Sequence, residues 1–172
     1  MANDTEPRDR LQPALLDRLV RDGGDGVRFI SKAELRAAVL RDLSWLFNSV
    51  QPHPEWVESH PALARTVLNY GMPALAGKQV SKIDVSRLER IIADTIKAFE
   101  PRILPATLVV SAIEPGSVMD THNIIEFEIR GHLWAQPVPL EILLRTKLDL
   151  EAGQVEVREV AGPASPGSAR MR

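Results

Sequence analysis

The pattern of apolar and polar positions predicts a long helix in the first half of the chain. Ser31 followed by Glu34 forms a capping box, in which the serine hydroxyl accepts a hydrogen bond from a free backbone N–H and the carboxylate reaches back to the cap. Apolar residues then recur every three or four positions, which places them on one helical face. We expect a helix from Lys32 to Asn48, with an apolar face made of Leu35, Val39, Leu43, Leu46 and Phe47.

A second strong helix is predicted further along, and both of its ends carry a signal. Asp84 has a side chain preferred at the N-cap position, and Pro101 disfavours helical backbone at Glu100. Shorter helices are expected over residues 11–20 and 62–69. The apolar face of the second strong helix consists of Leu88, Ile91, Ile92, Ile96 and Phe99.

The apolar spacing changes to a period of two in the C-terminal half. Residues 107–113 are mainly β-branched and apolar, which predicts a well-buried strand. Apolar and charged residues then alternate over residues 125–133, 138–150 and 155–160, as in strands with one buried face. Short turns, including Ala152–Gly153, favour antiparallel pairing. We expect an α+β fold, with N-terminal helices packed on a C-terminal antiparallel sheet of three to four strands.

Composition divides the 172 residues into one domain and two tails. Residues 1–10 are polar and charged and are expected to form a flexible arm, while residues 11–161 form a single domain. Residues 162–172 are rich in Gly, Pro and Ser and lack the apolar surface that offsets the cost of ordering, so we expect a disordered tail. Three prolines over residues 51–61 predict a surface loop.

Charge and residue usage narrow the possible partners. The 21 Lys and Arg residues nearly balance the 23 Asp and Glu residues, so no basic field favours nucleic acid. No segment approaches the roughly 18 consecutive apolar residues of a membrane span, which argues against direct membrane insertion. The absence of cysteine suits a reducing compartment. We expect a cytoplasmic protein that reaches membranes only through partners.

Candidate catalytic chemistry is sparse, and we expect neither an enzyme nor a cofactor or metal site. The four histidines do not form a metal-ligand spacing. Glu126 and Glu128 share the polar face of a strand, and a hydrolase acting on peptidoglycan through them is one alternative function. Half-burial of the strand already accounts for their spacing.

The junction Glu100–Pro101–Arg102 has two interpretations. It can be a helix stop with a charge pair at the surface, far from the apolar stripe, so that removing Arg102 would cost less than about 1 kcal/mol. It can also present an ion-pairing edge to a neighbouring protein. The residues alone leave both interpretations open.

Four segments together resemble a known family. They are residues 40–48, residues 67–77 with Asn-Tyr-Gly-Met-Pro, residues 91–102 ending in Glu-Pro-Arg, and residues 127–157. The chain resembles TssE, the baseplate subunit of the bacterial type VI secretion system, and with it the wedge protein of contractile phage tails that initiates the sheath. The resemblance implies a structural subunit that binds wedge proteins and sheath subunits, with assembly contacts at Glu100, Pro101 and Arg102. A regulatory binding module of the same fold is a further alternative.

The resemblance also implies a sheet like that of the sheath subunits, which interlock through strands. An exposed strand edge can accept a strand of another chain. We expect the last strand to provide this edge through Val155, Glu156, Val157 and Arg158, with only the disordered tail to cover it. One of Glu156 and Arg158 should direct its N–H outward.

Overall fold

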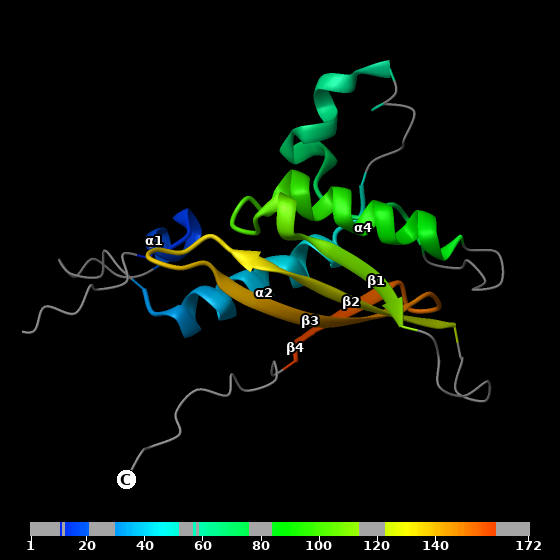
Figure 1. The fold of residues 1–172 in the computed structure, drawn as a ribbon. Helices are drawn as coiled ribbons and strands as arrows, with labels where there is room; N and C mark the ends of the chain where they lie inside the picture. The colour runs from blue at the N-terminus through cyan, green and yellow to red at the C-terminus, as the bar shows by residue number, and fades with distance from the viewer. Residues whose placement is uncertain are drawn as a thin grey trace, which may run out of the picture.

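The computed structural model describes residues 11, 13–20, 30–51, 57, 59–75, 84–113 and 123–160. Within these ranges helices precede strands along the chain, as Figure 1 shows. The α-helices are α1 (Leu15–Val20), α2 (Lys32–Asn48) and α4 (Val85–Phe99), and the 3-10 helices are η1 (Pro61–Arg65), η2 (Val67–Asn69) and η4 (Pro105–Thr107). The strands are β1 (Val109–Ile113), β2 (Ile124–Leu133), β3 (Leu140–Asp149) and β4 (Gln154–Glu159). The expected α+β class is confirmed.

The four strands form one antiparallel meander in the order β1-β2-β3-β4. Because successive side chains of a strand point to opposite faces, the alternating pattern fixes which face is buried. Alternate residues of the two central strands, including Phe127, Ile129, Leu144 and Leu148, are buried against the helices. The other face of the sheet carries mostly charged side chains.

Helices α2 and α4 cover the apolar face of the sheet with the side chains that the pattern predicted. The capping box of Ser31 and Glu34 is present, and Asp84 caps α4 by accepting the Arg87 N–H. Both helices and the sheet contribute to one apolar core. Its helical members include Leu35, Val39, Leu43, Leu46, Phe47, Leu88, Ile92 and Ile96.

The expectation of a well-buried first strand is wrong. The strand begins at Val109, because residues 105–107 form η4, and the Val109 side chain is 57% exposed. β1 pairs with β2 alone and is therefore an edge of the sheet. Its other side faces α4, whose Glu89 carboxylate accepts the Ala112 N–H at 2.7 Å. In Figure 1, β1 runs out from beneath this helix.

The shorter helices also differ from expectation. α1 covers only Leu15–Val20, and Leu15 and Leu19 are exposed, while Leu11 pairs with Ile30 in a β-bridge. Residues 61–69 form two 3-10 helices in place of one α-helix, and both stand above α4 in Figure 1. The loop expected over 51–61 includes helical positions at Val57 and Ser59. The tails at 1–10 and 162–172 lie outside the described residues.

Gly71 holds a tight crossing between the end of α2 and the segment that precedes α4. Its φ of 125° is rarely adopted by residues with a side chain, and an added Cβ would lie 2.4 Å from the Ser49 carbonyl oxygen. The Met72 N–H donates to that same oxygen at 2.8 Å. Glycine is therefore required for this close approach of two backbone segments.

Candidate functional site

The Glu100–Pro101–Arg102 junction begins where α4 ends. The Glu100 N–H still donates to the Ile96 carbonyl at 2.8 Å, so Glu100 is the last residue tied to the helix. Its side chain is only 4% exposed, whereas Pro101 is exposed. Arg102 turns back and donates from Nε to Glu100 Oε1 at 2.7 Å and from Nη2 to Glu100 Oε2 at 2.5 Å. This two-point geometry is the strong form of an arginine–carboxylate pair.

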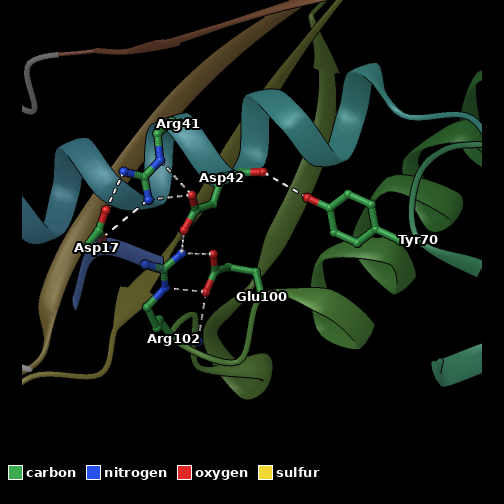
Figure 2. A network of polar contacts seen from close by, with 6 residues as sticks. All are labelled: Asp17, Arg41, Asp42, Tyr70, Glu100 and Arg102. Carbon is green, nitrogen blue, oxygen red and sulfur yellow. Dashed lines mark hydrogen bonds and ion pairs between the residues drawn. The ribbon is translucent and has the colours of Figure 1, made fainter. Parts of the chain in front are cut away.

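The ion pair continues into a network that crosses the molecule, drawn in Figure 2. Arg102 Nη2 also lies 2.6 Å from the Asp42 carboxylate on α2. Arg41 bridges Asp42, at 2.8 Å, and Asp17 of α1, at 2.6 Å. Two guanidinium groups therefore alternate with three carboxylates between the end of α4 and α1. The Arg41 guanidinium also lies 4.9 Å from the ring centre of Trp45.

The network changes the proton affinity of its members. Burial alone would lower the pKa of Arg102, but the hydrogen bonds and charges of Glu100 and Asp42 together raise it. The Asp17 carboxylate is the main cause of the raised pKa of Arg41. Burial raises the pKa of Tyr70, and the charges of Asp42 and Glu100 raise it further. The Tyr70 hydroxyl donates to the Asp42 carbonyl oxygen at 3.4 Å.

The segment after Pro101 is hydrogen-bonded to the end of β2 and to the residue that follows it. The Trp134 N–H donates to the Arg102 carbonyl at 2.7 Å, and the Leu104 N–H donates to the His132 carbonyl at 2.9 Å. Ile103, between them, forms a β-bridge with Leu133. The junction therefore joins three parts of the fold: α4, α2 and the sheet.

Of the two interpretations of this junction, the exposed surface charge pair is wrong. Glu100 is buried, and only 23% of the Arg102 side chain is exposed. The same Glu-x-Arg spacing recurs at Glu128–Arg130 and Glu156–Arg158, where the arginines are 64% and 71% exposed. Spacing alone therefore does not distinguish a buried pair from surface pairs. The difference lies in Asp42, which only the fold brings to Arg102.

The sequence patterns do not point to Arg41 as a site residue, but they do hold a signal for Asp42. This residue follows Val39 by three positions and precedes Leu46 by four, and both of those side chains are buried in α2. Residues at such spacing are neighbours on a helix surface. A carboxylate beside the apolar stripe needs a cation, and its partner Arg102 lies sixty positions away in the chain.

The last strand is a sheet edge, as expected, but its outward groups differ from the expected ones. The Val160 N–H donates to the Leu143 carbonyl at 2.9 Å, and hydrogen-bonding direction alternates along an antiparallel pair. Glu156 and Arg158 therefore direct their backbone groups toward β3, so the expectation that one of them donates outward is wrong. The outward residues are Val155, Val157 and Glu159.

Helix α2 also covers part of this edge, which corrects the expectation that only the C-terminal tail could do so. Asn48 Oδ1 accepts the Val155 N–H at 2.9 Å, and Asn48 Nδ2 donates to the Val155 carbonyl at 2.8 Å. At the other end of the strand, Arg36 forms an ion pair with the Glu159 side chain. A groove of about 550 Å³ borders the edge, lined by Ser44, Asn48, Ile124, Lys147, Asp149, Gln154, Val155, Glu156 and Val157.

The candidate catalytic carboxylates lie on the open face of the sheet and are paired with cations. Glu126 lies 3.1 Å from Lys147, and Glu128 lies 2.5 Å from Arg130. Among the residues that the structure describes, no group of three or more His, Asp or Glu side chains could hold a metal ion. No helix in this same part of the chain is long and apolar enough to cross a membrane.

Comparison with known proteins identifies the family of this chain. A family model described as baseplate wedge protein gp25 matches residues 33–138, well over half of the chain. The chain belongs to this family. The match confirms the resemblance to TssE, which is a member of the same family, and supports a structural role in a phage-tail-like baseplate. No curated protein and no solved structure matches the chain.

The family match includes the whole polar network except Asp17. It extends from α2 through the Glu100–Arg102 junction and β2, and it ends in the turn before β3. The β3–β4 hairpin, which carries the candidate edge, lies beyond the matched residues. The matched residues therefore include the junction. They include strands β1 and β2 of the sheet but not β4, which forms the candidate edge.

Removing Arg102 should destabilise the folded protein. We expect Arg102→Ala to lower the free energy of unfolding by about 3 kcal/mol, because it leaves the buried Glu100 carboxylate without its cation. Urea unfolding followed by circular dichroism measures the loss. The matched control is Arg130→Ala, which breaks an exposed pair of the same spacing and should cost less than about 1 kcal/mol. Equal losses for the two variants would contradict a special role for the buried network.

Tyr70 should titrate above the ordinary tyrosine pKa of about 10, because the folded protein disfavours the phenolate. It is the only tyrosine in the chain, so the ultraviolet absorbance of tyrosinate reports on it alone. Since the folded-state pKa is raised, the neutral phenol contributes stability fully below about pH 10, and this contribution is lost as the pH rises through the folded-state value. The titration midpoint should return to about 10 in urea. An unchanged midpoint on unfolding would contradict the assignment.

Proposed function

We propose that this chain is a wedge subunit of a type VI secretion baseplate that starts polymerisation of the contractile sheath. In this proposal it binds other wedge proteins near Glu100–Pro101–Arg102 and offers β4 to a strand of the first sheath subunit. It works in the cytoplasm, reaches the membrane through its partners, and requires neither a cofactor nor nucleic acid. Family membership supports the baseplate role, and the two surfaces are argued from their geometry.

The observation that carries the sheath contact is the outward backbone of β4. Val157 and Glu159 direct N–H and C=O groups away from β3, and no described residue forms a hydrogen bond with these groups. A strand edge with unpaired N–H and C=O groups can form hydrogen bonds with an extended segment of another chain, which then extends the sheet by one strand. The groove of about 550 Å³ beside the edge supplies space for that segment. Charged side chains along a short edge limit unwanted pairing, and β4 carries Glu156, Arg158 and Glu159.

The wedge contact involves the exposed part of the junction. Glu100 and Arg102 are largely buried and hold the backbone in place, while Pro101 is exposed at the surface. Trp134 is 54% exposed, and its N–H is bonded to the Arg102 carbonyl, so an aromatic surface lies next to the junction. Exposed aromatic side chains are frequent anchors of protein interfaces. In this proposal Glu100 and Arg102 act as positioning residues, and Pro101 lies in the contact surface.

Proline at position 157 tests the sheath contact. Val157→Pro removes one outward N–H from an edge strand, where proline is tolerated, so the protein should fold and still join wedge partners. It should fail to start sheath assembly, measured by sedimentation and electron microscopy of purified sheath subunits. Val157→Ala is the matched control, since it also removes the valine side chain and keeps the N–H. Normal sheath formation with a folded Val157→Pro variant would refute the edge as the template.

Replacing Pro101 tests the wedge contact separately from folding. We expect Pro101→Ala to keep the thermal midpoint within a few degrees, since an exposed proline contributes mainly about 0.4–1 kcal/mol through chain entropy. Co-purification with wedge subunits should weaken. Pro105→Ala, an exposed proline at the start of η4, serves as the control and should bind normally. Full binding by Pro101→Ala would assign the junction an architectural role alone.

A further inference from the structure

Asn48 occupies a position that a neighbouring strand would otherwise take. It is the last residue of α2, and its side-chain amide makes two hydrogen bonds to the backbone of one residue, Val155. The Oδ1 atom accepts from the Val155 N–H at 2.9 Å, and Nδ2 donates to the Val155 carbonyl at 2.8 Å. A residue of an added antiparallel strand would make the same pair of bonds. The amide therefore imitates a peptide group at the first outward site of β4.

We propose that Asn48 is a gate on the β4 edge, which an incoming strand must displace before it can pair along the whole of β4. This inference rests on the proposed function, in which a strand of a sheath subunit adds to that edge. Of the three outward residues, Val155 is occupied and Val157 is open, so pairing begins near Val157 and reaches Val155 last. Asn48 thus determines how readily the final part of the new strand forms.

The geometry lets Asn48 leave without disrupting the core. The side chain is exposed and borders the groove of about 550 Å³ beside β4. Its amide also donates to the Ser44 carbonyl at 2.8 Å within the same helix, so a local partner remains after it releases Val155. Hydrogen bonds between neutral groups at an exposed site contribute little net stability, because water replaces them readily. A strand that supplies the same two bonds can therefore take over this position.

The neighbouring serine provides a matched comparison. Ser49 caps α2, and its hydroxyl donates to the Trp45 carbonyl at 2.8 Å rather than to a backbone group of β4. Ser49→Ala therefore removes one hydrogen bond from the same helix end without opening the edge. Asn48→Ala removes the gate, and Asn48→Ser is a second variant whose shorter side chain keeps a polar helix end. With two substitutions of Asn48, the test can still be made if one of the two variants fails to fold.

The first measurement is hydrogen exchange of the full-length protein without any partner. We expect the Val155 amide to exchange roughly tenfold faster in Asn48→Ala than in the natural protein, and to be unchanged in Ser49→Ala. The second measurement is the lag of sheath assembly with purified sheath subunits. The lag should shorten roughly fivefold in Asn48→Ala, because the incoming strand no longer displaces the amide.

The outcomes separate this inference from the proposed function. If Val157→Pro blocks assembly and Asn48→Ala leaves the lag unchanged, the gate is refuted and the edge remains the template. If Asn48→Ala lengthens the lag, the amide helps to dock the strand, which also overturns the gate. If Val157→Pro assembles normally, the edge is not the template, and the gate falls with it. Dimerisation of Asn48→Ala that competes with sheath binding would identify a second copy as the occupant and overturn the sheath-strand gate.

Discussion

The buried carboxylate of Glu100 is the constraint on which the arrangement of this domain depends. A charged group that is removed from water needs compensating hydrogen bonds and an opposite charge. Arg102 supplies both, and its guanidinium is shared with Asp42 of α2. Helix α4, which Glu100 caps, therefore takes a fixed position relative to α2. The backbone after Arg102 then meets the end of β2 through the Trp134 N–H.

The position of α2 in turn determines which parts of the β4 edge are covered. One end of this helix brings Arg36 to Glu159, and its last residue brings Asn48 to Val155. The polar network lies between these two contacts, at Arg41 and Asp42. Helix α2 therefore contacts both the α4 junction, through Asp42, and β4, through Asn48. This physical continuity connects the two surfaces that the proposed function assigns to different partners.

Sequence reasoning succeeded where local patterns decide the structure. The capping box of Ser31 and Glu34, the cap at Asp84 and the alternation through β2 and β3 each depend on residues close together in the chain. It was less successful with contacts that depend on packing. The burial of Glu100 follows from Asp42, and the coverage of β4 follows from Asn48, more than one hundred positions away. The direction of each N–H in β4 required the register with β3, which a single strand does not contain.

The outward side of β4 presents backbone groups, which every residue except proline possesses in the same form. The hydrogen bonds of such a contact do not depend on the side chains of the strand, provided that the strand stays extended. Glu156 and Arg158 point their side chains to the open face and are not needed for the ladder with a new strand. The side chains at these two positions can thus vary while β4 keeps the same outward backbone groups. In the proposed function, the charges at those two positions would set which strands the edge accepts, while the backbone sets where an accepted strand lies.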